Sequence, residues 1–253
     1  MVGRIVGFGL ILMSVIGGCT KSMTPGKMQW VQAESNEEHV GNAYLIRGWL
    51  GLFSSGMDHL TVKINNVGVR AHVFQEDQWY QLAQRLRAAY RVDTNHEPLI
   101  LVGHSWGADD TLRVAQELEK DHIPVDLIIT LDPVTPPLVP PNVKRCINIY
   151  ESNGLWDTIP AWRGIPLKAE SERATQLTNS NVRVDRLDLL EPDTDHGNIE
   201  KNVKIHAEVL KEVLAICPPR SLWMAHRGLN NMNEPTHTMV TNQRSSERTM
   251  IGE

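Results

Sequence analysis

The chain has 253 residues, of which 41% are apolar and 22% are charged, and its formal net charge is -5. This length and apolar content suit one large domain or two small ones with a buried core, and they exclude a disordered polymer. The 25 basic residues do not outnumber the 30 acidic ones, so the composition argues against nucleic acid as a partner. Three cysteines are too few for a disulfide scaffold.

The N-terminus has the features of an export signal. Arg4 precedes an uncharged apolar run over residues 5–16, which is followed by the small residues Gly17 and Gly18. As a helix, this run of twelve residues would cover about 18 Å, which is well short of a hydrocarbon core of roughly 30 Å. The sequence therefore predicts a secretory signal peptide.

Residues 16–19, Ile-Gly-Gly-Cys, resemble the lipoprotein box of bacterial signal peptides. The resemblance implies that residues 1–18 are a lipoprotein signal peptide and that Cys19 is acylated and anchors the exported chain in a membrane. Thr20 stands where aspartate would favour inner-membrane retention, which favours the outer membrane, facing the periplasm, if the source is Gram-negative. An ordinary signal peptide and an uncleaved anchor are the alternatives, and both also export the domain.

The next segment, residues 19–42, mixes polar, charged and small residues without a sustained period, and we expect it to be a tether. From Ala43, short apolar runs alternate with stretches of helical period, which implies a mostly parallel sheet covered by helices on both faces. We expect strands over residues 43–46, 68–74, 98–103, 125–131, 143–150 and 182–190. The sequence thus predicts one α/β domain over residues 43–217, with about six strands.

The segment after Pro218 and Pro219 is rich in Asn, Thr, Arg, Ser and Glu. Because it has few apolar side chains to offset the entropy of ordering, residues 218–253 are predicted to form a mostly disordered tail.

A Gly-x-Ser-x-Gly motif occupies residues 103–107, between an apolar strand and an amphipathic helix. This context is typical of a nucleophile elbow, a sharp turn that lifts the serine above the end of the sheet and needs glycines where side chains would clash. The motif predicts Ser105 as a nucleophile. On these residues the chain resembles the α/β-hydrolase superfamily, particularly its lipases and thioesterases. The resemblance implies a three-layer α/β-hydrolase fold and the chain order nucleophile, acid, histidine.

A serine hydroxyl needs a base to take its proton, and the base needs a carboxylate to fix its tautomer. His196 lies in the loop before the last predicted helix, where the family places its base. Asp132, directly after the strand 125–131, is the preferred acid, as in some lipases. Asp157 follows the next strand, at the superfamily's more usual position, and stays an alternative. Two further alternatives are carboxylates of the histidine loop, Asp193 and Asp195.

The oxyanion of a tetrahedral intermediate must be met by backbone N–H groups. In this family one donor belongs to the residue after the nucleophile, here Trp106, and another to the loop after the first strand. In that loop Trp49 follows Arg47-Gly48, where relatives carry His-Gly. The arginine leaves open whether Trp49 or Leu50 supplies the second donor.

Five prolines between Leu131 and Val143 exclude a regular helix there, so we expect no large cap domain. Aromatic residues near the predicted site, among them Trp156 and Trp162, suit an acyl chain. The sequence has neither metal-ligand spacing nor a phosphate-binding loop, which predicts catalysis without a metal or cofactor.

These features favour a lipid-anchored serine hydrolase that cleaves a small-molecule carboxylic ester or thioester through an acyl-enzyme on Ser105. A non-enzymatic envelope lipoprotein that uses the fold for binding, and an acyltransferase with the same triad, are the alternatives. The sequence names no protein partner. In an oxidising compartment Cys146 and Cys217 could pair, provided that their Cα atoms lie within about 7 Å.

Overall fold

The computed structural model describes residues 23–48, 55–91, 96–152 and 164–233. Six parallel strands form one sheet in the order β2-β1-β3-β4-β5-β6. The strands are β1 (Asn42–Ile46), β2 (Arg70–Phe74), β3 (Leu99–His104), β4 (Val125–Leu131), β5 (Val143–Tyr150) and β6 (Gln176–Asn181). The α-helices are α1 (Ser55–Asn66), α2 (Trp79–Tyr90), α3 (Trp106–Glu119), α4 (Val203–Ile216) and α5 (Arg220–Asn233). The 3-10 helices among the described residues are η1 (Met28–Trp30), η3 (Glu76–Gln78) and η5 (Ile199–Lys201).

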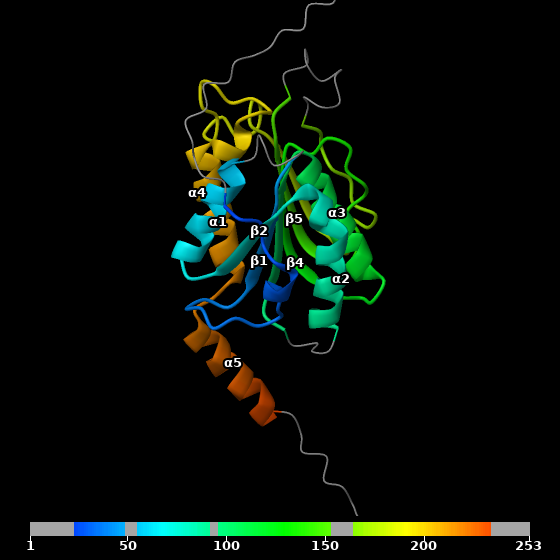
Figure 1. The fold of residues 1–253 in the computed structure, drawn as a ribbon, viewed down its shortest axis with the longest axis vertical. Coiled ribbons are helices and arrows are strands. Elements are labelled where there is room, and N and C mark those ends of the chain that lie inside the picture. Colours follow the sequence, from blue (N-terminus) through cyan, green and yellow to red (C-terminus); the bar gives the residue numbers. More distant parts are fainter. Residues whose placement is uncertain (1–22, 49–54, 92–95, 153–163, 234–253) are drawn as a thin grey trace, which may run out of the picture.

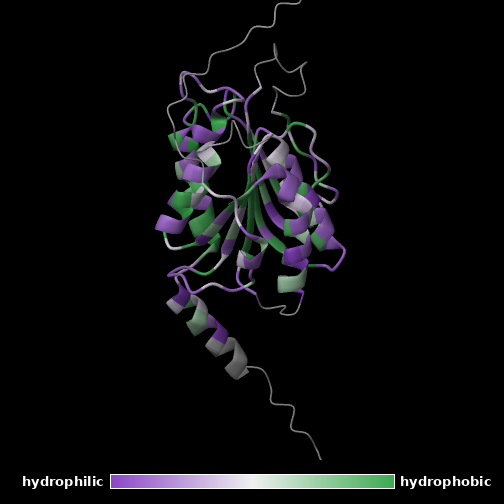
Figure 2. Ribbon diagram, in the orientation of Figure 1, coloured by the Kyte–Doolittle hydropathy of each residue, from purple (hydrophilic) through white to green (hydrophobic). Residues whose placement is uncertain are grey.

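Helices cover both faces of the sheet, α1 and α4 on one side and α2 and α3 on the other (Figure 1). Because side chains alternate along a strand, each inner strand supplies both cores. Ile100 and Val102 of β3 join the core under α1 and α4, whereas Leu99 and Leu101 join the core under α2 and α3. Hydrophobic residues accordingly concentrate along the strands between the helices (Figure 2). The predicted three-layer α/β-hydrolase fold with six strands is confirmed.

The connection between β4 and β5, residues 132–142, contains no helix, as its prolines predict. The predicted sixth strand is wrong, because residues 182–190 form turns and β6 precedes them. The apolar residues of that run do not share one face: Val182 is fully buried, whereas Val184 and Leu187 are exposed. β6 lies at the edge of the sheet and is polar, so it has no apolar run that would identify it.

The predicted tether over residues 19–42 is wrong from Met23 onward, because this segment packs on the domain. Val31 and Val40 are buried, and the N–H of Gly26 donates to the carbonyl of Val73 at 2.6 Å. The segment is ordered despite its polar composition because hydrogen bonds hold much of it. The N–H and hydroxyl groups of Ser35 both donate to the buried carboxylate of Glu97, at 3.2 and 3.0 Å.

The predicted disordered tail is also wrong in its first part, where α5 extends away from the domain (Figure 1). Its first residue is tied to the domain, since the Arg220 guanidinium forms an ion pair with Glu97 at 2.7 Å and donates to the Ser35 hydroxyl at 2.9 Å. Sequence composition alone did not reveal this long-range anchor. Residues 234–253 lie outside the described residues.

Cys146 and Cys217 are both buried and unpaired. Cys146 belongs to the core under α2 and α3, whereas Cys217 belongs to the core under α1 and α4. The sheet therefore separates the two sulfur atoms. Burial raises the pKa of each thiol to about 12, so both cysteines act as small apolar side chains.

Candidate active site

Ser105 lies at the sharp turn between β3 and α3. Its backbone angles, φ 56° and ψ -125°, lie outside the regions that L-residues ordinarily occupy, as at a nucleophile elbow. The turn is held because the N–H of Ser105 donates to the carbonyl of Leu131 at 2.9 Å, and its own carbonyl accepts from Ala108 at 3.0 Å. Hydrogen bonds to β4 and α3 thus hold Ser105 in this strained conformation.

Both glycines of the motif are required by close backbone approach. A Cβ atom on Gly103 would lie 2.2 Å from the carbonyl oxygen of Gly107. A Cβ atom on Gly107 would lie 2.3 Å from the carbonyl oxygen of Arg47, at the end of β1. These distances explain why a side chain fits at neither position, and they place the start of α3 directly against the loop after β1.

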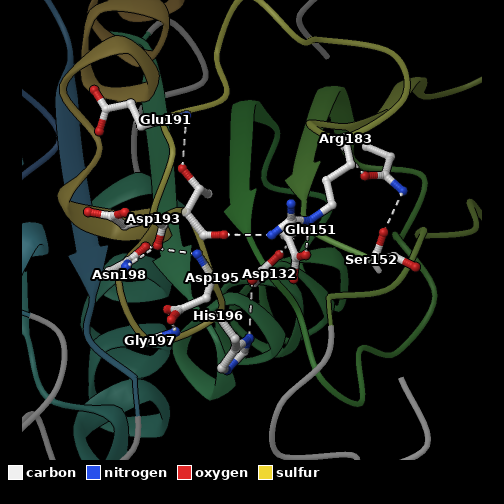
Figure 3. A network of polar contacts seen from close by, with 12 residues as sticks. Asp132, Glu151, Ser152, Arg183, Glu191, Asp193, Asp195, His196, Gly197 and Asn198 are labelled. Atoms are coloured by element: carbon white, nitrogen blue, oxygen red, sulfur yellow. Dashed lines mark hydrogen bonds and ion pairs between the residues drawn. The ribbon is translucent and has the colours of Figure 1, made fainter. Parts of the chain in front are cut away.

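His196 reaches Ser105 from the loop between β6 and η5. Its Nε2 lies 3.0 Å from Oγ of Ser105, and its Nδ1 lies 3.2 Å from Oδ2 of Asp132. Both side chains beside the ring are buried, Asp132 completely. The structure therefore brings three sequence-predicted residues, Ser105, His196 and Asp132, into one line of hydrogen-bonded groups, and Figure 3 shows the ring pointing to Asp132.

Asp132 follows β4 with a positive φ of 49°, an uncommon conformation for a residue that is not glycine. Its N–H donates to the carbonyl of Ile149 at 3.0 Å, which fixes the turn against β5. Burial raises the pKa of the Asp132 carboxyl, whereas hydrogen bonds from His196 and from the N–H of Glu151 lower it. The surroundings thus supply donors to the ionised carboxylate while they keep it from water.

Three residues outside the prediction fix the loops of the site, the buried Asp109 and Glu151 and the half-buried Arg183. Oδ1 and Oδ2 of Asp109 in α3 accept hydrogen bonds from the backbone of Val134 and Thr135, at 3.0 and 2.8 Å, which holds the segment after Asp132. Glu151 and Arg183 form an ion pair beside Asp132 (Figure 3). No local sequence pattern marks that pair, because its members are 32 positions apart.

His104 contacts the histidine loop through its ring. Its Nε2 lies 3.0 Å from the carbonyl oxygen of His196, so this nitrogen must donate. Burial and the nearby His196 lower the pKa of His104 to about 3, which keeps the ring neutral. His104 therefore supports the backbone of His196.

Asp193 and Asp195, the alternative acids of the histidine loop, make other contacts in it. Oδ1 of Asp195 accepts from the N–H of Gly197 at 2.8 Å, and the carbonyl of Asp193 accepts from the Asn198 amide at 2.5 Å. Both interactions close the loop on itself (Figure 3). The third alternative, Asp157, lies outside the described residues, as do Trp49, Leu50, Trp156, Trp162 and the lipid-attachment candidate Cys19.

Trp106, the other oxyanion candidate, is the first residue of α3, so its N–H has no carbonyl one turn earlier to bond. The loop that would supply the second donor begins at Arg47, whose side chain is fully buried. Its Nε donates to Asp58 of α1 at 2.8 Å, and its Nη2 donates to the carbonyl of Met23 at 2.6 Å. The arginine that departs from the family pattern thus ties the start of this loop to α1 and to the N-terminal segment.

Within the described part of the chain, no group of three or more His, Cys, Asp or Glu side chains could hold a metal ion. Among the same residues, no helix is both long and apolar enough to cross a membrane.

The sheet order and the serine at its elbow define the class of the fold, an α/β-hydrolase fold. Comparison with protein-family models and with curated protein sequences finds no match. Solved structures with a similar fold include an α/β serine hydrolase without a lid from Xanthomonas campestris, 15% identical, with a TM-score of 0.42 over 74% of this chain and 84% of that one.

Two further solved structures are 13% identical to this chain. A cutinase-like protein from Cryptococcus sp. matches with a TM-score of 0.41 over 69% of this chain and 93% of that one. Est1E from Butyrivibrio proteoclasticus matches with a TM-score of 0.40 over 71% of this chain and 90% of that one.

Proposed function

We propose that the protein is a serine hydrolase that cleaves a carboxylic ester or thioester through an acyl-enzyme on Ser105. The observation that supports this most directly is the line of contacts from Oγ of Ser105 through His196 to Asp132, at 3.0 and 3.2 Å. A nucleophile within hydrogen-bond reach of a base that is itself oriented by a third group is the signature of nucleophilic catalysis.

In the proposed reaction, Oγ of Ser105 attacks the substrate carbonyl while Nε2 of His196 takes the hydroxyl proton. Asp132 accepts the hydrogen bond of Nδ1 and stabilises the imidazolium that forms. The N–H of Trp106 and a second donor from the loop after β1 meet the oxyanion. His196 then gives its proton to the departing alcohol or thiol. In the second half of the reaction, water attacks the acyl-enzyme while His196 takes a proton from it. His196 then returns this proton to Oγ of Ser105 as the carboxylic acid leaves.

Replacing Ser105 with alanine is expected to abolish labelling by a fluorophosphonate probe and to lower turnover of short p-nitrophenyl esters by at least about 10³-fold, because the attacking atom is gone. The measurement is the labelled fraction and kcat of purified, folded protein. Ser180→Ala, in the buried end of β6, is the matched control and should label normally. Wild-type protein that is folded but takes up no probe would rule out the proposal.

We also propose that the hydrolase domain is exported and anchored through a lipid on Cys19, as residues 16–19 indicate. Full-length protein made in a bacterial host should incorporate labelled palmitate and enter the detergent phase in a phase-separation assay. Cys19→Ser should remove both properties, whereas Cys146→Ser, which changes a buried core cysteine, should retain them. Unlabelled wild-type protein in the aqueous phase would contradict the anchoring.

A further inference from the structure

Glu151 and Arg183 form an ion pair beside the proposed triad, and the two residues follow different strands. Glu151 directly follows β5, and its carboxylate is buried. Arg183 lies in the turn after β6, and its Nε donates to Oε1 of Glu151. Figure 3 shows the Arg183 side chain crossing to Glu151 next to Asp132 and the histidine loop.

Each member of the pair also contacts a chain segment that carries a proposed catalytic residue. The backbone N–H of Glu151 donates to Oδ1 of Asp132 at 2.5 Å. Nη2 of Arg183 donates to the carbonyl of Thr194 at 2.8 Å, two positions before His196. The ion pair therefore links the backbone next to the histidine with the backbone next to the acid.

The shape of the Arg183 guanidinium fixes the geometry of this link. The guanidinium uses Nε for Glu151 and Nη2 for Thr194, and its planar fork holds the two acceptors in a fixed relation. A lysine ammonium could replace the charge but not this geometry. Removing the guanidinium would also leave the buried Glu151 carboxylate without its cation.

We propose that Arg183 and Glu151 are positioning residues that hold the His196 loop against Asp132, so that the imidazole stays aligned between this carboxylate and Ser105. The inference rests on the proposed function, because it assigns the pair a part in the same reaction. Neither side chain is required to touch the substrate. A displacement of about 1 Å at reacting groups can cost about 10²-fold in rate, so the alignment alone gives the pair a measurable effect.

The test compares Arg183→Gln with Arg186→Gln, a matched arginine three positions later. Arg186 forms ion pairs with Asp188 and Glu208, away from the triad. Arg183→Gln is expected to lower kcat by about 10- to 100-fold with KM changed by less than about 3-fold, and to slow fluorophosphonate labelling to the same extent. Arg186→Gln should stay within about 2-fold of the wild type, and Arg183→Lys should lie between the two.

Titrating active sites separates positioning from folding. If the pair only stabilised the fold, Arg183→Gln would reduce the number of active sites but leave the rate at each remaining site unchanged, and that result would overturn the inference. Glu151→Gln keeps the backbone donor to Asp132 and serves if Arg183→Gln fails to fold. The double variant should lose no more rate than Arg183→Gln alone, because both substitutions break one interaction.

The controls also separate this inference from the proposed function. Wild-type protein without probe labelling would reject the function and the positioning role together. Labelled wild-type protein whose Arg183→Gln and Glu151→Gln variants both match Arg186→Gln in rate per site would reject the positioning role alone.

Discussion

Asp132→Asn is expected to lower kcat by on the order of 10⁴-fold while the protein stays folded. Oδ2 of Asp132 faces Nδ1 of His196 at 3.2 Å, so the carboxylate requires a proton on Nδ1 and leaves the lone pair of Nε2 for Ser105. An asparagine amide can instead donate to Nδ1, and the imidazole proton would then lie on Nε2. A protonated Nε2 cannot accept the proton of the serine hydroxyl. The measurement is kcat for a p-nitrophenyl ester, together with the circular dichroism of the folded variant.

Asp157→Asn is the control for this prediction, since Asp157 follows β5 at the acid position more usual in the superfamily. It should retain kcat within a few-fold of the wild type. A large loss in Asp157→Asn combined with near-normal activity in Asp132→Asn would transfer the role of the acid to Asp157. Losses in both variants would indicate that the two carboxylates act together.

The elbow could be predicted from sequence because its determinants are local. An apolar strand, two glycines, the serine and the amphipathic helix all fall within residues 99–119, and the backbone contacts of Gly103 and Gly107 explain the spacing. His196 could be predicted because it precedes α4, in the loop where the resemblance places the base.

The sequence leaves two carboxylates open as the acid, because Asp132 and Asp157 both follow strands whose carboxyl ends lie at one edge of the sheet. The Asp132 side chain is oriented by the positive φ of this residue and by a hydrogen bond from its N–H to the carbonyl of Ile149, a residue of the neighbouring strand. The Glu151–Arg183 ion pair also cannot be predicted from the sequence, because it depends on how two loops come together. Such contacts follow from tertiary structure and leave no periodic pattern.

The errors at the two ends of the domain have a related cause. Glu97 is buried two positions before β3 and accepts hydrogen bonds from Ser35 and Gly41, and it also pairs with Arg220. One buried carboxylate thus orders a polar segment before β1 and the first residue of α5. Composition predicts disorder where apolar residues are few, but a charged centre with several donors can order polar segments as well.

A second buried carboxylate, Glu200 in η5, has weaker partners. Its side chain is fully buried, and within the described part of the chain neither of its oxygens accepts a hydrogen bond of regular geometry. The ammonium of Lys201 lies 3.7 Å from Oε1 but is itself about half exposed. Burial raises the pKa of Glu200 from 4.5 to about 7, and Lys201 together with the backbone of Gly56 and of Glu200 itself offsets only part of this effect.

Glu200→Gln is therefore expected to stabilise the protein at and above pH 7, by up to about 3 kcal/mol. The unfolded chain releases the Glu200 proton near pH 4.5, whereas the folded chain holds it until about pH 7. Between these values the folded state binds more protons, so the free energy of unfolding of the wild type falls as pH rises. The free energy of unfolding of Glu200→Gln does not fall in this way, so its excess over the wild type should grow from pH 4.5 to pH 7.

Urea denaturation at pH 5 and at pH 8 measures this change as a difference between the two proteins at each pH. Glu208→Gln is a control of opposite sign, because burial is outweighed there by Arg186 and Lys211, which lower the pKa of Glu208. Its ionised form is the stabilised one, and both pH values lie above the unfolded pKa of 4.5, so Glu208→Gln should lose nearly the same stability at pH 5 and at pH 8. An advantage of Glu200→Gln that is equal at both pH values would show that the glutamine acts by packing and that the Glu200 carboxylate carries no charge cost.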